Sequence, residues 1–449
     1  MIGDLEGPVA RLDDAGRIIA EPFTLEWGVR AEERWRLAHE ERLRRGRVDD
    51  TPVYEQWLRV PGGDVIQRVG VVNDGAGRAL VVEFENASAS AVLIALAGHR
   101  PGATLQCDPS MLLAEGDPWM RPSRPAGALA VGDDVWTAVA GEPSADPVTG
   151  TDAAALLLPV PHRQTVQVTV AVEGPIPARD QTPVEIAAGW RTVADRVLSV
   201  EVPDADLTEA WRRIICDLII EAGSDDPLAA AESAWWLDLA GMVDEADRGR
   251  GVLVAAVEDG VITVEAAIAG LRALAGRDLI GGERSGIDQL ADVLVGYAGR
   301  ELDPETLGVV ADALAPTDAR AAKDARRLAA RLADADVTYR GPHSRVARGA
   351  ATVLGSLVAD HMNGRRLTLL PAVPEDWFGQ SIDVRGLATA VGTVSFSVRW
   401  HGDRPALLWE RDGGADDVEV RCPGLDPTWI SAERSGEALL AAPLAPGVG

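Results

Sequence analysis

The sequence of 449 residues is poor in positive charge and almost without lysine. It contains 43 Lys and Arg against 70 Asp and Glu, which gives a formal net charge of −27, and Lys323 is the only lysine. We interpret the rarity of lysine as a coding bias toward arginine. Nucleic-acid phosphates and anionic membrane surfaces both repel a chain of this charge. We therefore expect neither a nucleic acid nor a membrane among the partners.

Cysteine and long apolar runs are also scarce. The chain has three cysteines, Cys107, Cys216 and Cys422. Their odd number and the lack of CxxC spacing support neither a disulfide framework nor a zinc site. No His, Asp and Glu residues follow a metal-ligand spacing, and no Gly-rich loop ends in Lys-Ser/Thr. No apolar run is long enough for a bilayer, and the acidic N-terminus lacks an apolar signal core. These absences predict a cytoplasmic protein with no metal and no cofactor.

The first 200 residues show the pattern of β-sheets. Apolar and polar residues alternate, and Gly or Pro interrupts the pattern about every ten residues. The turn Pro61-Gly62-Gly63 between residues 53–60 and 64–72 predicts a hairpin. Residues 29–46, rich in Glu and Arg, predict a helix in this part of the chain. Further strands are predicted at 78–85, 91–96 and 165–172.

The middle of the chain changes to a helical period near residue 203. Apolar residues such as Leu207, Trp211 and Leu218 then recur at a spacing of 3.6. Asp226-Pro227 and Asp303-Pro304 are typical helix starts, with an N-cap followed by an N1 proline. After this first helix, seven more are predicted, at 227–241, 243–258, 263–275, 286–300, 304–314, 317–334 and 343–361.

The alternating period returns after Gly364, most clearly in Thr393–His401. The chain therefore reads as a multidomain α and β protein in the order β, α, β. We place an N-terminal β-sandwich domain at 1–202, an α/α helical domain at 203–363 and a C-terminal β-sandwich domain at 364–449.

One segment at the second boundary resembles a known family. Leu367-Thr-Leu-Leu-Pro-Ala-Val-Pro-Glu-Asp-Trp-Phe-Gly379, followed by Ser381-Ile-Asp-Val-Arg-Gly-Leu387 and Val398-Arg-Trp400, is similar to a stretch in six-hairpin glycosidases. The resemblance covers about 35 residues closely. It implies an N-terminal β-supersandwich, an (α/α)6 toroid that holds the active site, and a C-terminal β-sandwich. The prolines and Trp377 are typical of a rigid, packed crossing, so this motif indicates architecture and not catalysis.

Two departures from that family point to a reduced, divergent member. Residues 205–363 hold 159 residues, which allows about nine or ten helices of ordinary length, whereas a complete toroid has twelve. Fucosidase-like members also carry an aspartate base in a turn that enters the last toroid helix. With Gly349 in the glycine place of that turn, the position of the base is held by Arg345.

Glycoside hydrolysis requires two carboxyl groups across the scissile bond, and two are candidates here. Glu283 lies in a glycine-rich connection between helices that suits a cleft, although a solvated loop acid beside Arg284 is the plainer interpretation. Glu232 lies on the helix that also carries Trp235, Trp236 and Asp238.

The helical spacing of these residues places Glu232 beside the two tryptophans, where a sugar ring would stack. A tryptophan packed in the helical core with acids facing water is the plainer interpretation. We also predict substrate contacts from Trp235, Trp236, Asp238, His343 and Arg345.

Three functions remain open at this point. The first is a glycosidase-like protein without a standard acid/base pair that binds a carbohydrate or glycoconjugate or serves in an assembly. The second is an active inverting glycoside hydrolase or phosphorylase. The third is a structural protein whose helices offer a surface to a protein partner or to a second copy of the chain. Tryptophans exposed along a cleft would favour sugar binding, and wholly buried ones would favour a scaffold.

Overall fold

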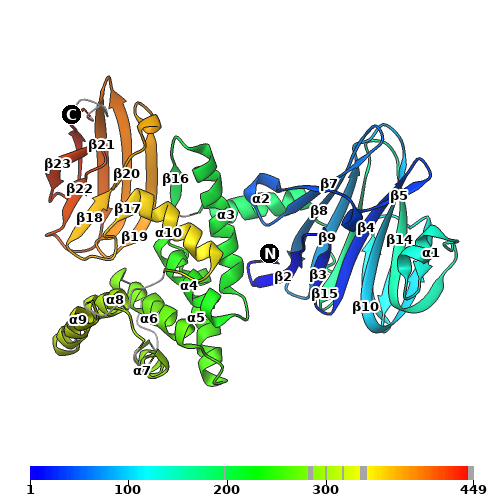
Figure 1. Cartoon of the computed structure of the whole chain (residues 1–449), viewed down its shortest axis with the longest axis horizontal. Helices are drawn as coiled ribbons and strands as arrows, with labels where there is room; N and C mark the ends of the chain where they lie inside the picture. The colour runs from blue at the N-terminus through cyan, green and yellow to red at the C-terminus, as the bar shows by residue number, and fades with distance from the viewer. Residues whose placement is uncertain (197, 282–286, 299–300, 316–317, 334–340, 443–449) are drawn as a thin grey trace. The chain divides into compact units, whose positions relative to one another are not determined.

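The computed structural model describes residues 1–196, 198–281, 287–298, 301–315, 318–333 and 341–442 (Figure 1). The chain divides into two compact units, Met1–Val193 and Ala194–Gly449. The predicted helical and C-terminal β domains both fall within the second unit. We describe each unit by itself.

The first unit is built on one large antiparallel sheet of 15 strands. Its main path runs β1-β2-β3-β4-β10-β11-β12-β15-β9-β8-β7-β6, with β5 paired to β4 and β14 paired to β10 and β13. The strands are β1 Ile2–Asp4, β2 Gly7–Leu12, β3 Ile18–Ala20, β4 Phe23–Ala31, β5 Arg34–Leu37, β6 Arg44–Arg47, β7 Tyr54–Val60, β8 Gly63–Asn73, β9 Arg78–Asn86, β10 Val92–Asp108, β11 Met111–Ala114, β12 Asp117–Pro122, β13 Ala128–Val131, β14 Val148–Val160 and β15 Thr165–Glu173.

The apolar residues that alternate along these strands form the core of the first unit. Trp27 and Phe84 are fully buried, and their ring centroids lie 5.4 Å apart. The predicted hairpin is confirmed, because Val60 pairs with Gly63 across a turn of two residues, Pro61 and Gly62. The short helix α1 (Val135–Ala140) packs on a patch of β10 and β14 made of small residues, which gives the helix room to approach.

The helix predicted at 29–46 is wrong. The structure has β4, β5, the 3-10 helix η1 (Ala38–Glu40) and β6 in this range. Long-range pairing decides the outcome, because β4 joins β10 over seven residue pairs and buries alternate side chains. Glu32 and Glu33, with φ of 50° and 65°, form the two-residue turn between β4 and β5. The sequence analysis also missed α1 and α2 (Pro183–Ala194).

After strand β16, the described residues of the second unit form eight α-helices, as the periodicity predicted. They are α3 Ala205–Ala222, α4 Pro227–Leu239, α5 Val243–Glu258, α6 Val264–Leu279, α7 Ile287–Ala298, α8 Pro304–Leu314, α9 Ala319–Ala333 and α10 Arg345–Leu357. Both predicted caps are confirmed. The Asp226 carboxylate accepts from the Leu228 N–H, and the Asp303 carboxylate accepts from the Thr306 N–H.

Two further sheets complete the second unit. One has the strand order β16-β19-β20-β21-β24 and the other β17-β18-β22-β23. The strands are β16 Ser199–Glu201, β17 Val358–Ala359, β18 Arg366–Leu369, β19 Ile382–Thr389, β20 Gly392–His401, β21 Arg404–Asp412, β22 Glu419–Cys422, β23 Asp426–Ser431 and β24 Ser435–Leu439. The observed order of β, α and β elements agrees with the prediction. Within the residues that the structure describes, no helix combines the length and apolar character needed to cross a membrane.

Candidate functional site

Helix α4 carries most of the residues that the sequence singled out, and the structure places them inside the helical array. Glu232, Trp235, Trp236 and Asp238 are all less than one-tenth exposed. The apolar residues of α4 point in nearly all directions because α3, α5, α6 and α10 all pack around it. A helix in this position has no face left for solvent.

Glu232 holds the start of helix α10. Its Oε1 accepts the His343 backbone N–H and its Oε2 accepts the Ser344 backbone N–H, each at 2.7 Å. His343 Nδ1 lies 3.3 Å from the same Oε1. Ser344 is the N-cap of α10, so the carboxylate lies where unpaired N–H groups and the helix dipole favour negative charge. Glu232 is thereby a link between two helices.

A second buried carboxyl group extends this link to helix α3. The hydroxyls of Ser344 and Ser233 donate to Glu221 Oε2 at 2.7 and 3.3 Å. Burial raises the pKa of Glu221, and the negative charges of Asp217 and Glu232 raise it further, while the two hydroxyls lower it. The Glu221 and Glu232 side chains are 8% and 7% exposed. Both oxygens of Glu232 and Oε2 of Glu221 accept from protein donors, so the pair links helices α3, α4 and α10.

Asp238 is neutralised by two arginines. Arg250 NH1 lies 2.6 Å from Oδ2, and Arg277 NH1 lies 3.4 Å from Oδ1. Burial raises the pKa of Asp238, and the hydrogen bond and positive charge of Arg250 oppose that shift. Trp235 is covered as well, because the Arg272 guanidinium lies 5.3 Å from its ring centroid.

Of the other predicted site residues, the structure describes Trp236, His343 and Arg345, and these do not form one open site with the carboxylates. Trp236 meets Trp235 edge to face, with ring centroids 6.3 Å apart. Arg345 is exposed on the first turn of α10, and the His343 side chain is half exposed beside Glu232. Glu283 lies outside the described residues. Their roles in catalysis or substrate binding stay predictions.

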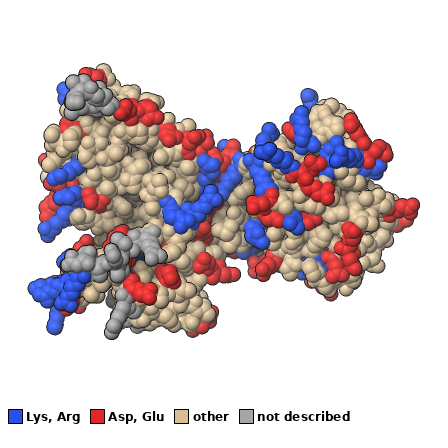
Figure 2. Space-filling model, viewed as in Figure 1, with Lys and Arg blue, Asp and Glu red and all other residues tan. Residues whose placement is uncertain are grey.

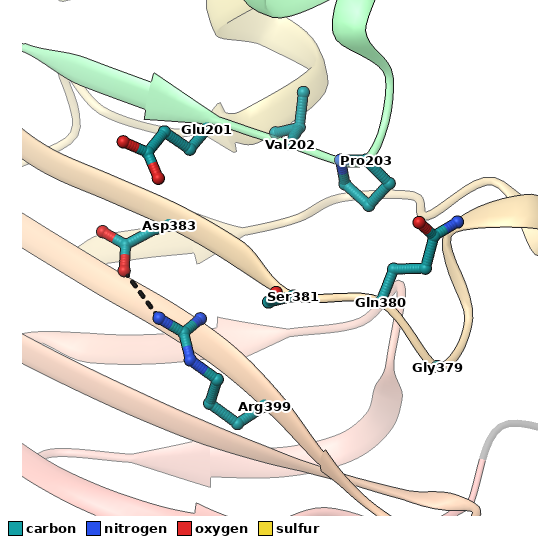
Figure 3. A pocket seen from close by; sticks show the side chains of 8 residues that line it. All are labelled: Glu201, Val202, Pro203, Gly379, Gln380, Ser381, Asp383 and Arg399. Carbon is teal, nitrogen blue, oxygen red and sulfur yellow. Dashed lines mark hydrogen bonds and ion pairs between the residues drawn. The ribbon is translucent and has the colours of Figure 1, made fainter.

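An open polar groove lies elsewhere in the second unit, where β16 leads into α3. One hollow of about 440 Å³ is lined by Glu201, Asp383, Arg399, Gln380 and their neighbours (Figure 3). A second hollow, also of about 440 Å³, shares Pro203 and Gln380 with the first and adds Trp377, among others. Sites for small ligands typically occupy about 300–1,000 Å³.

Strand register explains how the polar groups reach this groove. In the pairing of β16 with β19, Glu201 lies opposite Asp383 and Val200 lies opposite Val384. Side chains alternate across a sheet, so the two valines enter the core and the two carboxylates share the other face, where Glu201 is exposed and Asp383, covered by two arginines, is 8% exposed. Figure 3 shows both carboxylates on neighbouring strands, with Arg399 reaching Asp383 from β20.

Asp383 is held in one orientation by two arginines. Arg385 Nε donates to Oδ1 at 2.6 Å, and Arg399 NH2 donates to Oδ2 at 2.9 Å. Arg399 NH1 in turn donates to the carbonyls of Ile382 and Val398, which fixes the guanidinium. The hydrogen bond from Arg385 lowers the pKa of Asp383 most; burial opposes it, and Arg399 adds to it. Asp383 is therefore an ionised acceptor and not a proton donor near neutral pH.

In the sequence, Asp383 and Arg385 stand out only as part of the junction motif, and Glu201 does not stand out at all. Asp-x-Arg on a strand puts both side chains on one face, and this signal was available. The pairing of β19 with β16 could not be predicted, because Glu201 and Asp383 are 182 residues apart in the sequence. The described residues contain no group of three or more His, Cys, Asp or Glu arranged for a metal ion.

No protein-family model matches this sequence, and no curated protein matches it. Among solved structures, the chain is similar to a bacterial glucoamylase complexed with acarbose, with 10% identity and a TM-score of 0.45. That match covers 78% of this chain and 65% of the glucoamylase chain, which is less than two thirds of it. A TPR-domain containing protein from Parabacteroides distasonis matches with 11% identity, a TM-score of 0.16 and coverage of 76% and 78%. Similarities this low do not indicate the activity or the ligand of this chain.

Proposed function

We propose that this chain is a divergent six-hairpin-type protein that binds a carbohydrate in the groove around Gln380 without hydrolysing it. The observation that carries the proposal is the Asp383 carboxylate, fixed by Arg385 and Arg399 opposite Glu201 at the rim of a hollow. Fixed carboxylate, amide and guanidinium groups are the donors and acceptors that select hydroxyl-rich ligands.

The charge of the groove favours a neutral or amine-bearing sugar over an acidic one. The lining of the two hollows includes one guanidinium, that of Arg399, against five acids: Glu201, Asp204, Asp206, Asp376 and Asp383. A ligand carboxylate or sulfate would meet like charge there. The preferred ligand is therefore a saccharide without acidic groups.

The tryptophans do not supply the exposed ring faces that would favour sugar binding, so a sugar in this groove would be held mainly through hydrogen bonds. Eight of the 13 tryptophans are buried, and the other five are partly buried. Trp377 lines the second hollow but is only 5% exposed, and the Trp400 indole N–H donates to the Gln380 carbonyl at 2.8 Å. Neither offers a wide open ring face for stacking.

The test is a glycan microarray of neutral and amino oligosaccharides, followed by titration with the strongest binder and Trp fluorescence as the signal. Glu201 is exposed, and Glu201→Gln removes one charged acceptor from the groove, so we expect the Kd of this variant to rise about tenfold or more. Glu410→Gln, an exposed acid on β21 outside the groove, is the control and should bind normally. Absence of binding to every printed glycan at millimolar concentration, or equal Kd values for both variants, would contradict the proposal.

Hydrolysis is the second candidate, and one observation favours it. Directly opposed residues of antiparallel strands have Cβ atoms about 4.5–5.5 Å apart, so Glu201 and Asp383 are close enough to act on one glycosidic bond. Against it, Glu201 is exposed to water, whereas a general acid at neutral pH is usually buried among apolar groups. The test is whether the purified chain releases reducing sugar from the bound oligosaccharide. Release that is lost in Glu201→Gln would show that the chain is a hydrolase and not only a binding protein.

A further inference from the structure

Helix α9 carries a charge opposite to that of the chain as a whole. Within Ala319–Ala333 there are five cations and one acid, Asp324, while the whole sequence has a net charge of −27. Figure 2 shows Lys and Arg side chains gathered at the end of the helical array where α9 lies in Figure 1. The five cations are Arg320, Lys323, Arg326, Arg327 and Arg331.

Four of these cations form a stripe along one side of the helix. Arg320, Lys323, Arg327 and Arg331 follow one another at steps of three, four and four residues, which places them in line over about 16 Å. All four side chains are exposed. We call this set the α9 stripe.

The opposite side of α9 is already used for packing. Ala322 is 1% exposed, and Ala329 and Leu332 pack against the apolar cluster that includes Leu307 of α8. Arg326 lies off the stripe and pairs with Asp312 of α8 at 2.7 Å. Packing and this ion pair therefore fix the helix so that the α9 stripe faces outward.

The α9 stripe has an apolar neighbour. Leu328, one residue beyond Arg327, is 42% exposed. Within the stripe Arg327 is 64% exposed and lies 3.8 Å from Asp324, a weak surface pair that a competing acid can replace. A partner that matches this surface brings acids at helical spacing and at least one apolar side chain.

We propose that the α9 stripe is a docking site for an acidic amphipathic helix of a partner protein. Charge complementarity supplies the attraction, and Leu328 supplies an apolar contact beside it. Nucleic acids and anionic bilayers are less suitable partners. They are large enough to approach the strongly acidic remainder of the chain, which repels them. A single short helix can lie along the stripe of about 16 Å, where Asp324 is the one acid on α9 itself.

The experiment uses the full chain and a fluorescein-labelled helical peptide of about 18 residues, with Glu at i, i+4 and i+7 and Leu between them. Fluorescence anisotropy at low salt measures binding. We expect the Kd to rise at least tenfold in Arg327→Glu/Arg331→Glu, to rise less in the neutral Arg327→Gln/Arg331→Gln variant, and to rise with salt. Arg42→Glu, an exposed charge reversal in the first unit, should leave the Kd unchanged.

Four results would overturn the proposal. The first is an equal Kd for the wild-type chain and both Arg327/Arg331 variants, with far-UV circular dichroism unchanged. The second is tighter binding of single-stranded RNA, and the third is tighter binding of phosphatidylserine vesicles, than of the peptide. The fourth is self-association of the chain in light scattering that disappears in the variants, which would assign the α9 stripe to a second copy.

Discussion

The substitution Glu232→Gln separates a structural role of this carboxylate from a catalytic one. The change keeps the size of the side chain and removes its charge. In the wild-type chain the two carboxylate oxygens accept the backbone N–H groups of His343 and Ser344 at 2.7 Å each. A glutamine has only one oxygen, so its amide N–H₂ must face one of these two donors.

The expected loss of stability follows from the burial of Glu232, whose side chain is 7% exposed. A hydrogen bond to a charged group contributes about 1.5–3 kcal/mol, and a buried donor left without an acceptor costs about 1–3 kcal/mol. One lost bond and one unpaired N–H together predict that Glu232→Gln lowers the free energy of unfolding by about 2.5–6 kcal/mol. That is a large share of the roughly 5–15 kcal/mol typical of a domain.

Hydrogen exchange read by mass spectrometry is the assay, because it reports on helix α10 even when the two units of the chain unfold separately. The amides of α10 should exchange faster in Glu232→Gln than in the wild-type chain. Urea unfolding followed by circular dichroism should show the second unit unfolding at lower urea. The matched control is Glu209→Gln, an exposed acid on α3, which should change stability by less than about 0.5 kcal/mol.

Two results for Glu232→Gln would contradict the anchoring role of this carboxylate. If Glu232→Gln leaves α10 exchange and urea unfolding at wild-type values, the carboxylate does not anchor the helix. If the variant also loses sugar binding or sugar release while Glu201→Gln retains it, the site lies at α4 and not in the groove.

Three further predictions concern buried groups. Contacts with His99, whose Nε2 lies 3.6 Å from Oε2, and with the Trp136 indole N–H at 2.7 Å hold the pKa of Glu26 at about 2, against 4.5 ordinarily. Above pH 4.5 this carboxylate makes its full contribution to the stability of the first unit, up to about 3 kcal/mol, and the contribution is lost as pH falls toward 2. In urea titrations at a series of pH values, Glu26→Gln should lack this fall in the free energy of unfolding. Burial raises the pKa of Cys107 to about 11, so this thiol should resist Ellman's reagent until the chain unfolds. Asp238→Asn leaves Arg250 with Asp247 as its remaining acid, so the variant should lose about 1.5–3 kcal/mol in urea unfolding, the contribution of a hydrogen bond to a charged group.

Local signals were sufficient for the helices of the second unit. Pro227 and Pro304 directly follow capping aspartates, and α3 and α10 have strongly one-sided apolar stripes. Each of these features depends on residues within a few positions of one another. The sequence could therefore predict eight helices there, with errors of only a few residues at their ends.

Long-range pairing explains what the sequence could not supply. Residues 29–46 contain charged residues that suit a helix, but β4 gains a partner in β10, about 65 residues further on. Glu201 likewise became a site candidate only through its register with Asp383. On α4 the spacing did place Glu232 near the tryptophans, but it could not show that α10 delivers two N–H groups to that carboxylate.

Whether a carboxylate is available to a ligand depends on its partners more than on its position in a family plan. Glu232 and Asp238 have both oxygens engaged by protein donors and Glu221 accepts through Oε2, so a sugar would have to displace buried bonds to reach these atoms. In the groove Asp383 is also engaged, yet it stays ionised and lies at the rim of a hollow beside the exposed Glu201. Any hydrolysis there would need Glu201 as the proton donor. Glu201→Gln would then abolish sugar release completely but weaken binding only in part, and the relation between these two losses distinguishes a glycosidase from a binding protein.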